Sequence, residues 1–223
     1  MRTSKRPVPG PGARITGLEP DPRRRGALKV FVDGVHYATV HEGGRSAGLA
    51  VGGAFDEGQA EVVNRLAEEE GAWRALLVAL ERRGHGTQEL RRTLRRKAHH
   101  LEAVEYAIGR ARELKLLDDA EFAVNYVETR AARGRGPGRL RRDLMALGVE
   151  RPLIDRAITA HWPEPEEALD LARGLAEKRA RQLAGLAPEV KRRRLIQYLA
   201  RRGFTGRGVG ELVRKVLAPA GVG

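Results

Sequence analysis

The sequence contains no cysteine, which excludes disulfide bonds, thiolate metal sites and a cysteine nucleophile. Aromatic residues make up only 4% of the chain, although 41% of its residues are hydrophobic. Sandwiches and barrels of β-strands rely on aromatic and β-branched side chains, so this composition favours helices packed through Leu, Ala and Val. No run of about 18 apolar residues occurs, which predicts no transmembrane helix. The residues after Met1 lack the apolar segment of a signal peptide, so we expect a cytoplasmic protein with no membrane partner.

Acidic residues are scarce relative to basic ones. The 223 residues include 42 Lys and Arg but only 29 Asp and Glu, for a net charge of +13. The charges balance up to Ala72, and the whole excess lies from Trp73 onward. Such a surplus makes a polyanion the expected partner. Arginine far outnumbers lysine, which indicates either selection for bidentate contacts or a GC-rich coding bias.

The N-terminal third carries the β-branched runs. Short strands are predicted over residues 15–18, 28–32 and 37–40, and Asp33-Gly34 between the last two favours a tight hairpin turn. Asp56 followed by Gln59 resembles a capping box, which predicts a helix that ends before Gly71. We therefore expect a flexible basic tail over residues 1–12 and a β-hairpin plus helix over residues 13–71.

The remaining sequence repeats itself. When the sequence is shifted by 50 residues and then by 55, glycines and apolar residues recur in the same order. The matching apolar positions include Leu90, Leu140 and Leu195; Leu94, Leu144 and Leu199; and Val104, Ile154 and Val209. The first shift also places Leu76 and Leu77 on Tyr126 and Val127. The five extra residues of the second shift are expected to lengthen the loop around Leu183 to Pro188.

Three repeats follow from this register: repeat 1 (72–117), repeat 2 (118–163) and repeat 3 (164–223). Each is predicted to form three helices, which in repeat 2 cover residues 119–133, 137–147 and 152–162. Units of this size bury their apolar faces only by stacking. The expected fold is mainly α, an elongated tandem array of three three-helix repeats with a small N-terminal β-hairpin element.

Two motifs could suggest an enzyme. Asp118, Asp119 and Glu121 could hold Mg²⁺ in a nuclease, but Asp118 as a helix N-cap with Glu121 at the third helical position explains them better. The glycine-rich stretches 134–138 and 203–210 lack the Lys-Ser/Thr of a P-loop, so they are predicted to be turns between helices. His99 and His100 are adjacent and diverge. We expect no metal, no cofactor, no catalytic residue and no enzymatic activity.

Three clusters of basic residues are the candidate binding site. The neighbours of Leu90, Leu94 and Ala98, which we predict to form a buried stripe, should project from the helix surface. A solvated helix face is the usual explanation of such runs, yet acidic residues are sparse around these clusters. We expect them to contact phosphates or an acidic partner: Arg91, Arg92, Arg95, Arg96 and Lys97; Arg130, Arg133, Arg135, Arg139, Arg141 and Arg142; and Arg192, Arg193, Arg194, Arg201 and Arg202. Tyr198 and Phe204 are predicted to be core residues, which argues against base stacking.

The central repeat resembles a known family. The resemblance to RecX regulatory proteins is carried by Leu117-Asp118-Asp119-Ala120-Glu121-Phe122-Ala123, then Arg130, Gly136-Pro137, Leu140-Arg141, Leu144 and Gly148-Val149. Glu89-Leu90-Arg91 and Leu94-Arg95-Arg96-Lys97 are similar to the first-repeat stretch of that family. Where an Arg-Ser pair often precedes the Glu-Leu-Arg triplet, this sequence has His85 and Gly86.

The resemblance implies a non-enzymatic negative modulator of the RecA recombinase in DNA repair and recombination. Such proteins occupy the groove of the RecA–single-stranded DNA filament and restrain ATP hydrolysis, strand exchange and filament growth. The resemblance thus implies RecA and single-stranded DNA as partners, with duplex DNA as a further candidate, and we expect a monomer. An alternative function is duplex DNA binding, with a three-helix unit as a helix-turn-helix reader of the major groove.

Overall fold

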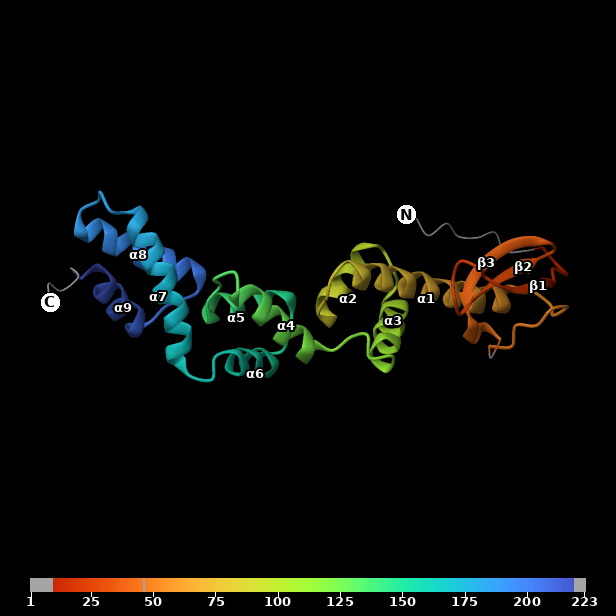
Figure 1. The fold of residues 1–223 in the computed structure, drawn as a ribbon. Helices are drawn as coiled ribbons and strands as arrows, with labels where there is room; N and C mark the ends of the chain where they lie inside the picture. Colours follow the sequence, from red (N-terminus) through yellow and green to blue (C-terminus); the bar gives the residue numbers. More distant parts are fainter. Residues whose placement is uncertain (1–9, 46, 219–223) are drawn as a thin grey trace. The chain divides into compact units, whose positions relative to one another are not determined.

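The computed structural model describes residues 10–45 and 47–218. The chain divides into two compact units, residues 1–117 and residues 118–223 (Figure 1). Each unit contains two separate clusters of buried hydrophobic side chains. Most of the predicted basic tail, residues 1–9, lies outside the described residues. None of the described helices has the length and apolarity needed to cross a membrane.

A three-stranded antiparallel sheet begins the first unit. Its strands β1 (Ile15–Pro20), β2 (Ala27–Val32) and β3 (Val35–His41) pair in the order β1-β2-β3 (Figure 1). A short 3-10 helix, Glu42–Gly44, follows. The predicted hairpin turn is confirmed, since Asp33 and Gly34 both have positive φ, 48° and 80°. These values give the turn the twist that the flanking strands need.

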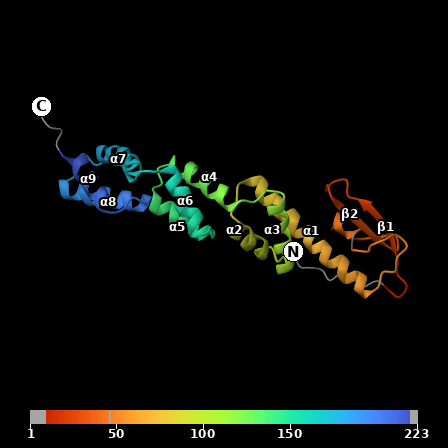
Figure 2. The same ribbon diagram turned by 90° about the horizontal axis from the view of Figure 1, so that it is seen from below.

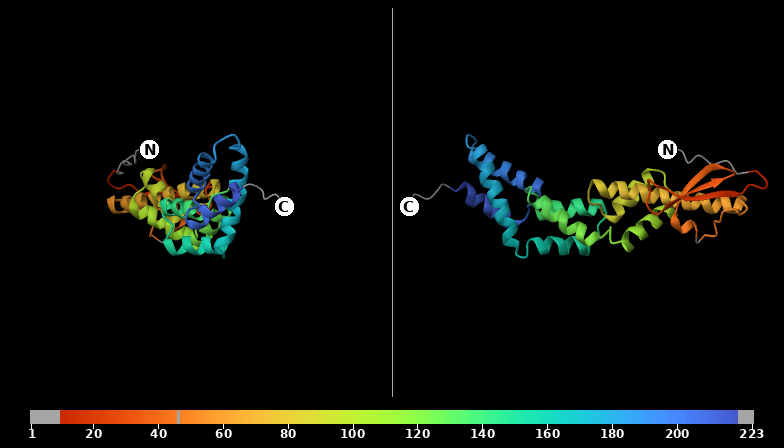
Figure 3. Two further views of the ribbon diagram at one scale, coloured as in Figure 1. Left: turned by 90° about the vertical axis from the view of Figure 1, so that its left-hand side faces the viewer. Right: turned by 45° about the vertical axis from the view of Figure 1, so that its right-hand side comes forward.

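Helix α1 (Glu57–Arg82) lies against the sheet with its N-terminal half and continues into repeat 1 (Figure 3). The Asp56 side chain accepts a hydrogen bond from the Gln59 amide at 2.8 Å, which confirms the predicted N-cap. The predicted end of this helix before Gly71 is wrong. One glycine costs a helix about 1 kcal/mol, which the burial of Trp73 and Leu76 just beyond it offsets.

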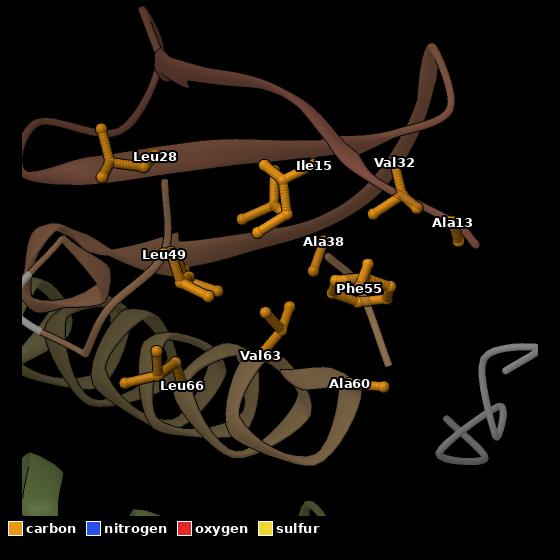
Figure 4. Packing of buried hydrophobic residues seen from close by; sticks show 12 residues of the cluster. Ala13, Ile15, Leu28, Val32, Ala38, Leu49, Phe55, Ala60, Val63 and Leu66 are labelled. Carbon is orange, nitrogen blue, oxygen red and sulfur yellow. The ribbon is translucent and has the colours of Figure 1, made fainter. Parts of the chain in front are cut away.

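Helix α1 therefore supplies side chains to both cores of the first unit. Ala60, Val63 and Leu66 face the sheet and pack beneath Leu28, Ile15 and Phe55 (Figure 4). Ala72, Trp73 and Leu76 belong to the core of repeat 1. The predicted boundary between residues 71 and 72 falls within this helix.

The described helices after the sheet form three groups of three, as predicted. In each group the first helix packs against the third, and the middle helix covers them. Repeat 1 uses the C-terminal half of α1 with α2 (Thr87–Arg96) and α3 (Leu101–Glu113); repeat 2 uses α4 (Asp119–Ala131), α5 (Pro137–Leu147) and α6 (Arg151–His161); repeat 3 uses α7 (Pro165–Gln182), α8 (Pro188–Arg202) and α9 (Arg207–Leu217).

The shared register is confirmed for the second and third helices of the repeats. The superimposed leucines of α2, α5 and α8 have side chains without exposed surface, and the superimposed residues of α3, α6 and α9 are buried as well: Leu90, Leu140 and Leu195; Leu94, Leu144 and Leu199; Val104, Ile154 and Val209. Gly148 and Gly203 end α5 and α8 with left-handed backbones, φ 87° and 95°. The same side chains thus build three separate cores.

Two details of the predicted register are wrong. In the first helices the buried residues are Leu76 and Val127, which are 51 residues apart. The offset is 51 because Val127 precedes Leu140 by 13 residues, whereas Leu76 precedes Leu90 by 14. The connection 183–187 is no longer than its counterpart 132–136. The extra length of repeat 3 lies mainly in α7, with 18 residues against 13 in α4, and in α8, with 15 against 11 in α5.

Candidate interaction surface

An ion pair repeats between the middle and third helices. Arg91 on α2 donates to both carboxylate oxygens of Glu105 on α3, at 2.8 and 2.6 Å. Fifty residues later, Arg141 on α5 donates to Asp155 Oδ1 on α6 through two nitrogens, at 3.0 and 3.1 Å. The hydrogen bond from Arg91 holds the pKa of Glu105 below its usual range. Two predicted binding arginines therefore connect helices within their own repeats.

Repeat 3 lacks this ion pair. The shift of 55 residues places Ile196 at the arginine position and Gly210 at the acidic position. Helices α8 and α9 pack without this charged link, and Ile196 is partly exposed. The charge distribution of repeat 3 thus differs from that of the other two repeats.

Two further predicted arginines share one carboxylate in repeat 2. Arg135 Nη1 lies 2.6 Å from Asp143 Oδ2, and Arg139 Nε lies 2.9 Å from Asp143 Oδ1. Asp143 is mostly buried, and its contact with Arg135 ties the turn before α5 to that helix, whereas its contact with Arg139 lies within α5. The expectation that acidic residues are sparse around the cluster is wrong at this point, because Asp143 lies on α5 itself.

The glycine-rich stretch 134–138 is a turn and the start of a helix, as predicted. The amide of Gly136 donates to the Arg202 carbonyl at 2.7 Å, and the amide of Gly138 donates to the Gly203 carbonyl at 3.0 Å. The N-terminus of α5 therefore meets the C-terminus of α8 (Figure 2). Backbone donors that could cradle a phosphate are used between the two repeats.

Close backbone packing defines this contact between repeats 2 and 3. A Cβ atom at Gly203 would lie 2.2 Å from the Arg139 amide nitrogen, and one at Gly138 would lie 2.9 Å from the Gly203 carbonyl oxygen. Arg202 Nη1 also reaches the carbonyl oxygens of Arg133 and Gly134, at 3.3 and 3.1 Å. The turn prediction for residues 203–210 holds only for Gly203 to Gly206, since α9 begins at Arg207.

The aromatic side chains near the basic clusters are covered. The guanidinium of Arg130 lies 5.4 Å from the centre of the Tyr126 ring. Those of Arg202 and Arg179 lie 4.8 and 5.7 Å from the Tyr198 ring. Tyr198 packs against the core of repeat 3 and Phe204 is buried within it, which confirms the prediction that both are core residues. The rings are therefore placed for packing rather than for stacking with bases.

The remaining predicted cations lie on the surface. Arg92, Arg95, Arg96 and Lys97 are exposed at the end of α2, where Arg96 also donates to Thr93 Oγ1 at 3.3 Å. Within the described part of the chain, several exposed arginines have no carboxylate within salt-bridge distance: Arg133, Arg142, Arg192, Arg193, Arg194 and Arg201. Ala98 is exposed with φ 64°, so its predicted place in the buried stripe is wrong.

The acidic motif at the start of repeat 2 caps a helix. Asp118 Oδ1 accepts hydrogen bonds from the amides of Ala120 and Glu121, at 2.7 and 3.1 Å. This geometry confirms the N-cap interpretation of Asp118. In the described ranges no three His, Asp or Glu side chains converge as they would around a metal ion.

The acidic partners Glu105, Asp143 and Asp155 were not predicted. One signal was available, because the shift of 50 residues that aligns Arg91 with Arg141 also aligns Glu105 with Asp155. A charge pair that recurs at the repeat period indicates a contact between helices. No comparable repetition marks Asp143.

The sheet and the three successive helical groups define a protein of tandem three-helix repeats with an N-terminal β element. Residues 118–158 match the family described as RecX, second three-helix domain, and residues 166–209 match RecX, third three-helix domain. The regulatory protein RecX of Pseudomonas entomophila (strain L48) is 34% identical over 142 residues, which cover 63% of this chain and 88% of that protein. The regulatory protein RecX of Thermobifida fusca (strain YX) is 36% identical over 152 residues, 67% of this chain and 80% of that one. The chain belongs to the RecX family.

Solved structures agree with this assignment. A crystal structure of regulatory protein RecX superimposes with a TM-score of 0.75 at 26% identity, over 91% of this chain and 99% of that chain. The crystal structure of RecX from Lactobacillus salivarius has a TM-score of 0.59 at 20% identity, over 67% of this chain and 96% of its own, and shares the fold. The family assignment therefore extends to the three-dimensional structure.

Proposed function

We propose that this chain is a cytoplasmic negative modulator of the RecA recombinase in DNA repair and recombination. It binds the groove of the RecA–single-stranded DNA filament and restrains ATP hydrolysis, strand exchange and filament growth. Membership in a family of proteins named for regulation supports this role. The partners are RecA and the phosphates of single-stranded DNA, and the protein acts as a monomer.

One observation of the structure carries this proposal: the surface arginines fall into two classes. One class is engaged with carboxylates or carbonyl oxygens of the protein itself and includes Arg91, Arg135 and Arg141. The other class is exposed without such a carboxylate and includes Arg133, Arg142 and Arg193. Guanidinium groups of the second class can meet phosphates or carboxylates of a filament without breaking contacts within the protein.

The proposed mode of action is steric and electrostatic rather than catalytic. The acidic group most typical of a nuclease, around Asp118, stabilises the start of α4 through its hydrogen bonds to backbone amides. A protein that occupies a filament groove slows the filament by restraining neighbouring subunits and needs no reacting group. Binding energy alone then produces the inhibition.

The first experiment is retention of the chain on RecA. Purified protein is incubated with RecA alone, with RecA and single-stranded DNA, and with RecA, DNA and ATP. Selective retention by the complete nucleoprotein filament is the expected result. Sequence-selective binding to duplex DNA without RecA would instead favour the helix-turn-helix alternative.

The second experiment tests which arginines act on the filament. Replacement of Arg133 and Arg142 by Glu should strongly reduce inhibition of RecA ATPase on single-stranded DNA. The matched control replaces Arg23 and Arg25, which are also exposed, and changes the net charge equally. Arg135 and Arg139 are unsuitable for this test, because glutamates there would face Asp143 and disturb the turn. Equal loss of inhibition in both variants would show that net charge alone matters.

A further inference from the structure

Repeat 3 contains the longest stretch of the chain without an acidic residue. No Asp or Glu occurs between Glu189 and Glu211, whereas this stretch contains seven basic residues: Lys191, Arg192, Arg193, Arg194, Arg201, Arg202 and Arg207. Most of the stretch is α8. Arg91, Arg135, Arg139 and Arg141 of repeats 1 and 2 pair with carboxylates, whereas no salt bridge is formed by the described basic residues of α8. Helix α8 thus differs from its counterparts in net charge as well as in length.

The buried stripe of α8 fixes the direction of its other side chains. Leu195 and Leu199 point into the core of repeat 3. With about 3.6 residues per turn, Arg193, Arg194 and Arg201 lie on the opposite side, within an arc of roughly 100°. Gln197 completes this face, and all four side chains are exposed. We call Arg193, Arg194, Gln197 and Arg201 the α8 face.

The α8 face presents three cations, with Arg193 and Arg194 adjacent at one end and Arg201 at the other. From Arg193 to Arg201 it extends over about 12 Å, at 1.5 Å per residue. Arg202, next in sequence, points elsewhere, since its guanidinium binds the carbonyl oxygens of Arg133 and Gly134. The α8 face is therefore held on a helix fixed at its C-terminus by contacts to repeat 2, and its own side chains remain available.

The chemistry of the α8 face fits a phosphate backbone better than a protein surface. The core of a protein interface combines arginine with aromatic residues and methionine, whereas this face holds three guanidinium groups and one amide and no apolar side chain. The nearby Tyr198 ring is covered by Arg179 and Arg202, so it offers no stacking platform for a base. Contacts limited to phosphates would be independent of sequence.

Single-stranded DNA, the polyanion of the proposed function, suits this face better than a duplex does. A flexible strand can adjust its phosphates to three guanidinium groups that are held at fixed positions on a helix. In a helix-turn-helix reader the second helix, here α9, would present base-reading side chains at its start. Arg207 is the one residue of that turn whose side chain could read a base, since Gly208 and Gly210 offer none and Val209 is buried.

On the basis of the proposed function, we infer that the α8 face of repeat 3 is the site that binds the phosphate backbone of single-stranded DNA. The paired arginines of repeats 1 and 2 stabilise contacts inside their own repeats and do not contact the strand. Binding through the α8 face is independent of RecA, so it can be measured on the protein and DNA alone.

The test compares two full-length triple variants. The first replaces Arg193, Arg194 and Arg201 by Gln, which keeps a high helix propensity. The control replaces three exposed cations of the neighbouring helix α7 by Gln: Arg173, Lys178 and Arg181. The control changes the net charge equally, but its residues lie among Asp170 and Glu177. Circular dichroism verifies that both variants are folded.

The measurement is fluorescence anisotropy of a labelled 20-nucleotide oligothymidylate, titrated with each protein at several salt concentrations. The α8 variant should bind roughly ten- to a hundredfold more weakly at low salt, and its log K against log salt slope should be shallower by about 2. The control variant should bind nearly as the natural chain does. Equal losses in the two variants, no loss in the α8 variant, or tighter binding of the natural chain to a duplex of the same length would overturn the inference.

An ATPase assay with RecA separates this inference from the proposed function. If the natural chain binds the oligonucleotide through the α8 face yet has no effect on RecA, the inference holds and the proposed function fails. If the natural chain inhibits RecA while the α8 variant binds the oligonucleotide normally, the proposed function holds and the inference fails.

Discussion

Two junctions between neighbouring cores show opposite solutions to the same problem. In the first unit, the sheet core and the core of repeat 1 meet at buried charged groups on α1. In the second unit, repeats 2 and 3 meet where the backbones of Gly138 and Gly203 touch. We call these the polar junction and the glycine junction.

The polar junction is centred on two buried glutamates of α1, Glu69 and Glu70. Glu69 Oε2 lies 2.8 Å from His41 Nε2, which joins α1 to the last residue of β3. The His41 ring stacks on Tyr106 of α3, with ring centres 4.8 Å apart. Tyr106 accepts a hydrogen bond from Arg110 at 3.1 Å. Side chains from the sheet, from α1 and from α3 therefore meet at one place.

The comparison teaches what each junction depends on. Buried charges must be desolvated, so the polar junction is sensitive to the loss of one partner and to protonation. The glycine junction is made of backbone hydrogen bonds and of Arg202, which stays charged across the accessible pH range. It depends on the absence of side chains at Gly138 and Gly203. The polar junction should be weakened when a buried charged partner is removed or protonated. The glycine junction should be weakened when a substitution adds a side chain at the contact.

The largest effect is expected at the glycine junction. Gly203→Ala would place a Cβ atom in contact with the Arg139 backbone and also force alanine into a left-handed conformation. We expect a loss of at least about 3 kcal/mol and a fall in Tm on the order of 10 °C. Thermal unfolding followed by circular dichroism measures both.

Gly206→Ala is the matched control for this prediction. Gly206 also has a positive φ, 103°, but nothing lies within 4 Å of the position of its Cβ. The free energy of unfolding of this variant should fall by only about 1–2 kcal/mol, because alanine is strained in the left-handed conformation but makes no clash there. Equal destabilisation by the two substitutions would mean that close packing at Gly203 contributes nothing.

A smaller loss is expected at the polar junction. Glu69→Ala leaves His41 buried without its carboxylate and should cost about 2–3 kcal/mol in the free energy of unfolding. Glu61→Ala, at an exposed position of the same helix, should change stability by less than about 0.5 kcal/mol. Urea unfolding of both variants gives the difference. If Glu69→Ala proved as mild as Glu61→Ala, the polar junction would not hold the sheet to repeat 1.

A cap outside both junctions provides a reference. Asp118→Ala removes the side-chain acceptor for the amides of Ala120 and Glu121 and should cost about 1 kcal/mol. Asp118→Asn should cost only a few tenths of a kcal/mol, because Asn caps helices about as well. A nuclease assay with Mg²⁺ accompanies the unfolding curves. Cleavage that disappears in Asp118→Asn would reveal a catalytic carboxylate.

The smallest effect is expected at Glu70 and depends on pH. Burial raises the pKa of Glu70, against the opposing charges of Arg24, Arg74 and Arg110. The folded state therefore binds the proton more tightly than the unfolded state, so Glu70 lowers stability as pH rises from about 4.5 through its raised pKa. Glu70→Gln should remove this decline, and its advantage over the natural chain should grow across that range.

The glycine junction supplies the control for this pH dependence. The destabilisation by Gly203→Ala should be the same at pH 5 as at pH 7.5, because a steric contact does not titrate. Unfolding curves at several pH values test both variants together. A Glu70→Gln advantage that shrinks with rising pH would contradict the raised pKa.

Sequence reasoning predicted the repeat cores well but did not predict the carboxylate partners of the arginines. Buried positions such as Leu140 and Leu195 follow from periodicity, since apolar residues that recur at helical spacing lie on one face of the helix and that face is buried. The pairing of Arg135 with Asp143 depends on how a turn folds back onto its helix, which the order of residues does not reveal. The contact of Gly138 with Gly203 joins residues far apart in sequence, so only the structure brings them together.

The continuation of α1 through Gly71 links the folding of two cores. The 26-residue helix α1 contributes side chains to the sheet core and to the core of repeat 1. Neither core can therefore lose this helix while the other core stays intact. Residues 10–117 should therefore unfold in one cooperative step, with the amide hydrogens near Glu69 and Trp73 among the last of this unit to exchange with solvent. Dividing the chain between residues 71 and 72 would split α1. Each piece would then lack part of the helix that its neighbouring core packs against, so neither piece would be an independent domain.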